Sequence, residues 1–149
     1  MKLCLVASAG GHLMELLLVR EAWQDYERLW VTFPTGDAQS LLKGEKTVWA
    51  FHPTNRHILN LVRNTWLAWR LLRRERPDVI LSTGAGVAVP FIWIGRLLKI
   101  RTVFIESLAF TTRRSLSGVL VYPFVDHYYV QWPDLARKYA KAVYRGMVL

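Results

Sequence analysis

The stretch KLCLVASAGGH, residues 2–12, decides the fold of this chain. Its first six residues form an almost continuous apolar run, as expected for a strand that is buried on both faces of a parallel sheet. Ser8, Ala9 and two glycines then turn the chain toward a helix that we predict over residues 13–23. A buried strand that passes through a glycine-containing turn into a helix is typical of an α/β protein.

The same alternation of short apolar runs and helical stretches continues along the chain. Further strands are predicted at residues 28–33, 47–51, 79–81, 102–105 and 128–131. Further helices are predicted up to Gly44, over 55–74, 92–98 and 117–122, and as a last turn at 135–139. No repeat, low-complexity tract or linker interrupts the pattern. The sequence therefore predicts one domain over residues 1–149, an α/β fold with a doubly wound, Rossmann-like parallel sheet.

Composition and charge narrow the class of partner. The 149 residues fit one domain, and 52% of them are hydrophobic, which excludes wholesale disorder. Lys and Arg total 20 against 11 Asp and Glu, so the net charge is +9. Nucleic acid and an anionic membrane surface both attract such a chain. A mean hydropathy of +0.16 and seven tryptophans favour the membrane, and no nucleic-acid module is recognisable, so we expect no nucleic-acid partner.

Cysteine content and apolar segments indicate where the chain works. Cys4 is the single cysteine and lies between leucines, which predicts a core position and fits a reducing compartment. Ala7-Ser8-Ala9 imitates a signal cleavage site, but the apolar run before it is too short for a secretory signal. The longest apolar stretches, 87–98 and 116–125, are interrupted and shorter than the roughly 18 residues that span a bilayer. We expect the chain to lie on a membrane without crossing it.

The loop at residues 8–12 is the first candidate site, because ligands of such folds bind at the carboxyl ends of strands. Gly10 and Gly11 let backbone N–H groups approach a ligand, and the following helix start favours a phosphate or diphosphate. His12 stands where the loop becomes a helix and is a candidate general base. The alternative is a tight strand-to-helix turn with an incidental histidine.

Two further strand ends carry polar or small residues at the same predicted edge. Ser82-Thr83-Gly84-Ala85-Gly86 follows the fourth strand and is a candidate for holding a second phosphate, unless its small residues merely serve packing. Glu106 and Ser107 follow the fifth strand. Because Glu106 ends an apolar strand, its carboxylate is expected to point into the same edge as the two loops, and the alternatives are a helix cap or an arginine partner.

Several cofactor classes are excluded by missing motifs. The chain has no Gly-x-Gly-x-x-Gly, no acid after its second strand and no Gly-Lys-Ser/Thr, which argues against nicotinamide and P-loop nucleotide sites. His52, His57 and His127 have no metal-ligand spacing, and cysteine pairs are absent. We therefore expect neither a cofactor nor a metal.

The predicted helix over residues 55–74 carries the strongest basic signal. Its arginine stripe comprises Arg56, Arg63, Arg70 and Arg74. Its apolar arc, which can face the core, comprises Leu59, Val62, Trp66 and Trp69. Leucines beside the arginines suit a lipid headgroup layer, so the predicted membrane-binding residues are Arg63, Trp66, Leu67, Arg70, Leu71 and Arg74. The alternative is a core helix with a solvated basic face.

These loops, followed by a characteristic carboxyl-terminal third, resemble a known family. That third contains Leu116-Ser117-Gly118, Tyr122-Pro123, Gln131-Trp132-Pro133 and then Tyr139, Tyr144 and Gly146. In this order the residues are similar to the oligosaccharide-biosynthesis family of the bacterial PssD/CpsF-type proteins. The same family includes the membrane-anchoring subunit of the eukaryotic dolichol-linked UDP-N-acetylglucosamine transferase. The resemblance covers nearly the whole chain.

The resemblance implies the acceptor-side half of a two-domain, GT-B glycosyltransferase. A PssE/CpsG-like partner chain would hold the nucleotide sugar, and the acceptor would be a saccharide on a polyprenyl diphosphate. The enzyme would be inverting, peripheral on the cytoplasmic face of the cell membrane, and active in polysaccharide biosynthesis, as in exopolysaccharide or capsule assembly. The alternative is a non-catalytic recruiter of a separate glycosyltransferase.

The resemblance also implies roles for individual residues. Gly10 and Gly11 would contact the acceptor diphosphate, with Gly84 and Gly86 as a second wall, and His12 would be the base. Glu106 would be an alternative base or would orient His12. The remaining predicted substrate-binding residues are Ser8, Thr83 and Ser107.

The chain departs from the family in two places. The family often has an arginine soon after Glu-Ser, whereas this chain continues Leu108-Ala109-Phe110 and places Arg113 and Arg114 later. The transmembrane anchor of the eukaryotic members is missing, so the helix at 55–74 would have to replace it.

Overall fold

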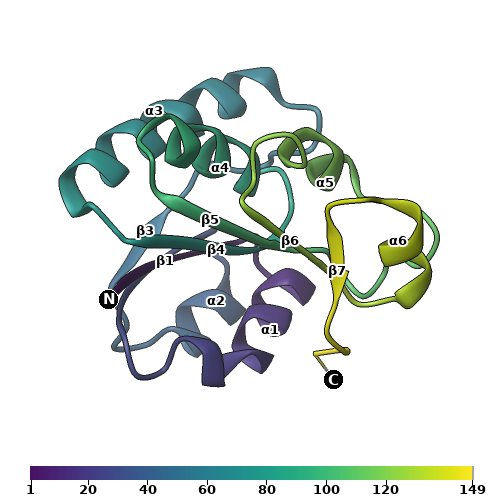
Figure 1. Cartoon of the computed structure of the whole chain (residues 1–149). Helices are drawn as coiled ribbons and strands as arrows, with labels where there is room; N and C mark the ends of the chain where they lie inside the picture. The colour runs from purple at the N-terminus through teal and green to yellow at the C-terminus, as the bar shows by residue number, and fades with distance from the viewer. Residues whose placement is uncertain (149) are drawn as a thin grey trace.

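One parallel sheet between two layers of helices organises the computed structural model, which describes residues 1–148 (Figure 1). The strands follow the spatial order β3-β2-β1-β4-β5-β6-β7, and each pairs in parallel with its neighbours. They are β1 (Lys2–Ala7), β2 (Glu27–Thr32), β3 (Thr47–Trp49), β4 (Val79–Gly84), β5 (Arg101–Ile105), β6 (His127–Val130) and β7 (Ala142–Tyr144).

The helices divide between the two faces of the sheet (Figure 1). One face carries α1 (Gly11–Leu18), the 3-10 turn η1 (Arg20–Ala22) and α2 (Gly36–Leu41). The other carries α3 (Ile58–Glu75), α4 (Ala88–Leu97) and α5 (Leu116–Val121), while α6 (Pro133–Lys138) lies beside β7. Strand order reverses between β1 and β4, so α1 and α4 leave these neighbouring strands toward opposite faces. A crevice for a ligand forms at such a switch point.

The predicted doubly wound fold is confirmed, with two differences in detail. The core placement of Cys4 is also confirmed, since its thiol is fully buried and burial raises its pKa. The first helix ends at Leu18 rather than near residue 23, because Trp23 turns inward and donates to the Leu16 carbonyl oxygen at 2.9 Å. Strand β7 is not predicted, because three residues at an exposed edge are too few to show a strand pattern.

The orientation of α3 differs from the prediction. Its buried residues are Asn60, Asn64, Ala68, Leu71 and Leu72, and its most exposed apolar residues are Ile58, Leu59, Val62 and Trp66. The predicted core-facing arc is therefore wrong, because it points to solvent. The predicted lipid contact of Leu71 is wrong as well, since this side chain is 3% exposed, and Leu67 packs partly against the core.

Two asparagines explain why α3 faces the sheet in this way. Asn64 forms paired hydrogen bonds with the backbone of Phe51: Oδ1 accepts from the N–H group and Nδ2 donates to the carbonyl oxygen, both at 2.9 Å. Asn60 Nδ2 donates to the Pro53 carbonyl oxygen at 2.8 Å. These bonds satisfy the buried amides, so polar side chains can occupy the inner face of the helix.

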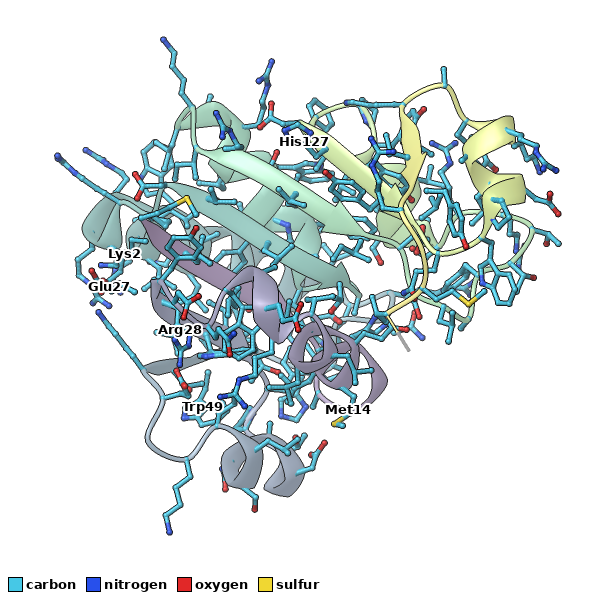
Figure 2. All side chains as sticks on the ribbon, turned by 60° about the horizontal axis from the view of Figure 1, so that its bottom comes forward. Lys2, Met14, Glu27, Arg28, Trp49 and His127 are labelled. Carbon is cyan, nitrogen blue, oxygen red and sulfur yellow. The ribbon has the colours of Figure 1, made fainter. Side chains whose placement is uncertain are left out.

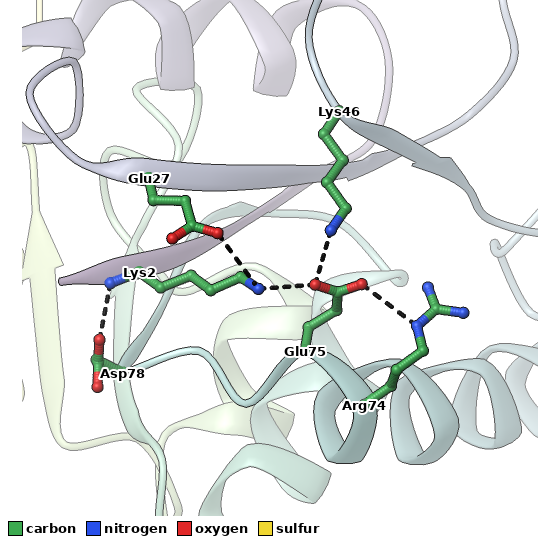
Figure 3. Close-up of polar contacts among 6 residues, drawn as sticks. All are labelled: Lys2, Glu27, Lys46, Arg74, Glu75 and Asp78. Carbon is green, nitrogen blue, oxygen red and sulfur yellow. Dashed lines mark hydrogen bonds and ion pairs between the residues drawn. The ribbon is translucent and has the colours of Figure 1, made fainter.

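An ion-pair network fixes the carboxyl end of α3 to the sheet (Figure 3). Glu75 lies 2.7 Å from the ammonium groups of both Lys2 and Lys46. Lys2, and after it Lys46, hold the pKa of Glu75 at about 2. The backbone N–H of Lys2 also donates to Asp78 at 2.7 Å. The network joins α3 to β1 and to the start of β3.

Candidate functional site

His12 and Thr83 meet at the switch point and bind each other twice. The imidazole Nδ1 lies 2.8 Å from the Thr83 carbonyl oxygen, and the Thr83 hydroxyl donates to the His12 carbonyl oxygen at 2.5 Å. A carbonyl oxygen only accepts, so Nδ1 must carry the proton. The ring is thereby held in the tautomer whose Nε2 has a free lone pair. Such a nitrogen can accept a proton from a substrate hydroxyl.

Gly84 allows the imidazole to lie against the end of β4. Its φ is +117°, a conformation that side chains disfavour. A Cβ at this position would stand 3.2 Å from Cε1 and 3.3 Å from Nδ1 of His12. Gly84 thus lies directly behind the ring, and the imidazole is positioned by β4 as well as by its own helix.

A groove of about 720 Å³ opens in front of His12, between the amino ends of α3, α4 and α5. Trp93 joins two of its walls, because its indole N–H on α4 donates to the Leu120 carbonyl oxygen at 3.0 Å. Of the predicted site residues, His12 and Gly86 line the groove. The other lining residues are Thr54, Asn55, Arg56, His57, Ile58, Leu61, Ala85, Val89, Trp93, Phe110, Ser115, Leu116, Ser117 and Leu120.

The remaining predicted loop residues lie at the same sheet edge but outside the groove lining. Gly10 caps α1 with φ +79°, and Gly11 is the first residue of that helix, where N–H groups are free of helical partners. Both glycines are exposed, and Ser8 is half-buried. Their placement leaves the first turn of α1 open to a ligand beside the groove.

The hydroxyls of Thr83 and Ser107, which we predicted to bind substrate, form hydrogen bonds within the protein instead. Thr83 is fully buried and holds the backbone of His12. Ser107 is 8% exposed and donates to Glu15 Oε1 at 3.0 Å. The prediction of substrate contact is wrong for these side chains, because both hydroxyls already bind the first helix. Through these hydrogen bonds Thr83 and Ser107 hold α1, which carries His12, in place.

Glu106 is a buried anchor and does not touch His12. Its carboxylate accepts from the Ser107 and Ser115 N–H groups and, at 2.5 Å, from the Tyr128 hydroxyl. The predicted direct orientation of His12 is therefore wrong, since the imidazole takes Thr83 as its partner. With 1% exposure, Glu106 is also shielded from a substrate proton. It fixes the loop that precedes α5.

The residues around Glu106 pack closely on its carboxylate and hold the loop that follows it. A Cβ at Gly118 would overlap the Glu106 carboxylate and the Tyr128 hydroxyl. Burial, followed by the charge of Glu106, raises the pKa of Tyr128, so the phenol stays protonated and keeps donating. Gln131 Nε2 donates to the Glu106 carbonyl oxygen at 3.0 Å, and Trp132 Nε1 to that of Leu108 at 2.8 Å. The Gln-Trp-Pro segment thus clamps the same loop.

Arg114 secures the far end of this loop. Its guanidinium lies 4.4 Å from the ring centre of Tyr122 and 4.1 Å from that of Tyr139, which is cation–π geometry on both sides. Arg113 beside it is exposed. The shifted arginine pair therefore contributes one stacked structural residue and one surface charge.

Glu15 belongs to the site although the sequence analysis missed it. Its Oε1 accepts from Ser107 Oγ and from the Leu108 N–H, both at 3.0 Å. Within residues 1–148 its Oε2 is buried without a hydrogen-bond partner. The available signal is its spacing, because a residue three positions after His12 shares the same face of a helix.

Helices α3 and α5 both carry exposed apolar residues. Leu59, Val62 and Trp66 are 54%, 60% and 62% exposed, and the arginines at 63 and 70 stand among them. On α5 the exposed residues are Leu116, Val119 and Leu120. Of the helices within residues 1–148, none is both long and apolar enough to pass through a bilayer. An apolar helix face with arginines suits contact with a lipid surface.

Sequence comparisons connect the chain with transferase subunits. The family described as "Oligosaccharide biosynthesis protein Alg14 like" matches residues 51–148. The UDP-N-acetylglucosamine transferase subunit ALG14 of Rattus norvegicus is 30% identical, over 99% of this chain and 82% of its own length. That of Yarrowia lipolytica is 28% identical, over 99% of this chain and 81% of its own length.

Structural comparisons support the fold. MurG of Acinetobacter baumannii superposes with a TM-score of 0.73 and 19% identity, over 89% of this chain and 42% of its own length. The UDP-GlcNAc 2-epimerase of Methanocaldococcus jannaschii gives a TM-score of 0.73 and 14% identity, over 99% of this chain and 46% of its own length. This chain therefore spans less than half the length of these solved structures.

Proposed function

The chain belongs to the Alg14-like family of oligosaccharide biosynthesis proteins, and on this premise we propose that it is the acceptor-side subunit of a two-chain, inverting glycosyltransferase. The transferred sugar would come from a nucleotide sugar that a partner chain holds. The acceptor would be a saccharide linked to a polyprenyl diphosphate. The description of the relatives from Rattus norvegicus and Yarrowia lipolytica as transferase subunits supports the need for a second chain.

The tautomer of His12 is the observation that carries the proposal. The acceptor hydroxyl gives its proton to Nε2 while its oxygen attacks the anomeric carbon of the donor sugar. The bond from that carbon to the nucleotide diphosphate breaks, and the diphosphate leaves with the bonding electrons. One base suffices for such a displacement with inversion, and Nε2 is available because Thr83 occupies Nδ1–H.

The groove in front of His12 is the proposed acceptor site. Its lining is mainly apolar and includes Arg56 and His57, a combination that suits an isoprenoid lipid with a phosphorylated head. Gly10 and Gly11 present the first turn of α1 beside the groove and are proposed to assist in holding the diphosphate. Gly84 and Gly86 form the opposite wall, through His12 and Thr54 respectively.

The exposed face of α3 is the proposed membrane-binding surface. Trp66, Arg63 and Arg70 meet the requirements of a helix that lies in a headgroup layer. The chain would sit on the cytoplasmic face as a peripheral protein, with the groove turned toward the lipid that carries the acceptor.

For the biological process we propose polysaccharide biosynthesis of the PssD/CpsF type, with a PssE/CpsG-like chain as the donor-binding partner. The Gln131-Trp132-Pro133 segment, which is part of the resemblance, supports this assignment because it has a structural role: Gln131 and Trp132 both donate hydrogen bonds to the loop that begins at Glu106. The alternative is a recruiter that brings a complete transferase to the membrane.

A sugar-transfer assay separates the two roles. A radiolabelled nucleotide sugar and a polyprenyl-diphosphate-linked saccharide are supplied to this chain alone, to the donor-binding chain alone, and to both. Product from the mixture only supports a shared active site. Product from the donor-binding chain alone would reduce this chain to a recruiter, and full activity of this chain alone would contradict the two-chain proposal.

A further inference from the structure

Arg56 stands apart from the other arginines of its segment. The sequence places it on the same stripe as Arg63 and Arg70, but α3 begins only at Ile58. Arg56 adopts φ +51°, a left-handed conformation that is uncommon for residues other than glycine. It therefore leaves the helix surface and lines the groove together with His12.

The loop that carries Arg56 is held at both ends. Buried Asn64 binds both backbone polar groups of Phe51, and buried Asn60 binds the Pro53 carbonyl oxygen. Thr54 packs so closely on Gly86 that a Cβ there would stand 2.9 Å from its side chain. The loop is thus fixed to α3 on one side and to the start of α4 on the other, and Arg56 is presented by a rigid support.

The end of the groove near Arg56 is suited to an anion. His57 Nδ1 accepts from the Asn60 N–H at 3.2 Å, so the proton of a neutral ring is on Nε2, which can donate. Across the described residues, no carboxylate lines the groove and Arg56 forms no ion pair. An unpaired guanidinium next to an imidazole favours a phosphate group, which arginine can bind through two N–H donors.

The rest of the groove is suited to hydrocarbon. Its apolar lining is formed by Leu61 of α3, Val89 and Trp93 of α4, and Leu116 and Leu120 of α5. A ligand that fills both parts needs an anionic head joined to an apolar chain. A nucleotide would place its polar base against the apolar walls, which disfavours it.

We infer that Arg56 binds the diphosphate of the lipid-linked acceptor while the first isoprene units of that lipid occupy the groove between α3, α4 and α5. This assignment rests on the proposed function and adds to it a phosphate-binding residue outside the glycine-rich loops. It also separates Arg56 from the arginines that face the membrane. His12 lies in the same groove, so the arginine would place the acceptor head within reach of the base.

Farnesyl diphosphate is the probe that tests this assignment, because it has the head and a short tail without a bilayer. Its binding to the full chain is measured by calorimetry for the wild type, Arg56→Gln and the control Arg20→Gln, an exposed arginine on the opposite face of the sheet. We expect Arg56→Gln to raise the Kd for farnesyl diphosphate about 10-fold or more and Arg20→Gln to leave it unchanged. Farnesol, which has no phosphates, should bind both variants and the wild type equally.

A vesicle arm distinguishes this ligand from bulk phospholipid headgroups. Flotation with vesicles of anionic phosphatidylglycerol should be the same for Arg56→Gln and the wild type. An unchanged Kd for farnesyl diphosphate in Arg56→Gln would overturn the inference, and so would an equal loss of farnesol binding, which would indicate a collapsed groove. Loss of flotation without loss of farnesyl diphosphate binding would assign Arg56 to the membrane surface instead.

The inference and the proposed function can fail separately. Absence of farnesyl diphosphate binding in the wild type would overturn the inference, whereas the two-chain assay alone decides whether transfer occurs. An active mixture whose acceptor KM does not respond to Arg56→Gln would leave the glycosyltransferase in place and remove Arg56 from its acceptor site.

Discussion

At the scale of single residues, the site depends on one imidazole and on what surrounds it. His12 is the proposed base, while Thr83 fixes its tautomer and Gly84 makes room for the ring. Glu106 has a structural role, because its carboxylate accepts hydrogen bonds from Ser115, in the loop before α5, and from Tyr128. Two residues that the sequence offers as equal candidates for the base are thus separated by burial and by hydrogen bonding.

Replacing His12 by Gln should lower kcat of the two-chain enzyme by about 10²–10⁴-fold, because the proton acceptor is lost. The acceptor KM should change little, since the groove keeps its walls. His127→Gln is the matched control, because this histidine is exposed at the amino end of β6 (Figure 2) and does not line the groove. Initial rates at varied acceptor concentration separate kcat from KM, and a wild-type kcat in His12→Gln would remove it as the base.

At the scale of an element, α3 illustrates what a sequence pattern cannot settle. Its hydrophobic arc is real, but hydropathy alone does not say whether the arc meets the core or a membrane. Asn60 and Asn64 decide the matter by binding a loop whose path depends on tertiary structure. The buried strands, in contrast, are predictable, because β1 is apolar over nearly its whole length and β4 begins with three apolar residues, and such runs fit the interior of a parallel sheet.

Substituting Trp66→Ser together with Arg70→Glu should reduce binding to anionic vesicles about 10-fold or more, since an inserted aromatic ring and a basic contact are both lost. The fold should remain, because Trp66 is 62% exposed. Flotation measures the binding and circular dichroism the fold. Arg20→Glu is the control, as it makes the same charge change as Arg70→Glu on the opposite face of the sheet. Unchanged flotation of the double variant would contradict a membrane role for α3.

At the scale of the whole molecule, the alternating pattern predicts six of the seven strands and a doubly wound sheet, whereas only part of the candidate site can be predicted from the sequence. The sequence predicts that the ends of β1, β4 and β5 share one sheet edge, and they do. It does not predict that the loop before α3 crosses to the start of α4 and adds Arg56 to the groove. Contacts between segments that are distant along the chain depend on packing, which no local pattern encodes.

Stability against acid should report the network that joins α3 to the sheet. The folded pKa of Glu75 is about 2, against 4.5 for the free group, so its contribution is complete above pH 4.5 and is lost as the pH falls toward 2. Glu75→Gln should therefore lower the free energy of unfolding by about 1–2 kcal/mol at pH 7, a figure that already allows for solvent screening of the ion pairs. The loss should become progressively smaller below pH 4.5. Urea unfolding at several pH values measures this difference. Glu27→Gln is the control, because Glu27 is 72% exposed and lies 3.5 Å from Lys2; a constant penalty for Glu75→Gln at all pH values would contradict the assignment.

The hydrogen bond between His12 and Thr83 has a consequence for folding during synthesis, because it joins positions 71 residues apart. During translation β1 and the first turn of α1, which carries His12, leave the ribosome first, followed by the segments that form β2 and β3. The imidazole obtains its partner only after more than half of the polypeptide has been synthesised and β4 has paired with β1. A ribosome-bound fragment that ends before β4 therefore carries an imidazole without its orienting partner, so the proposed base is in place only once the centre of the sheet is complete.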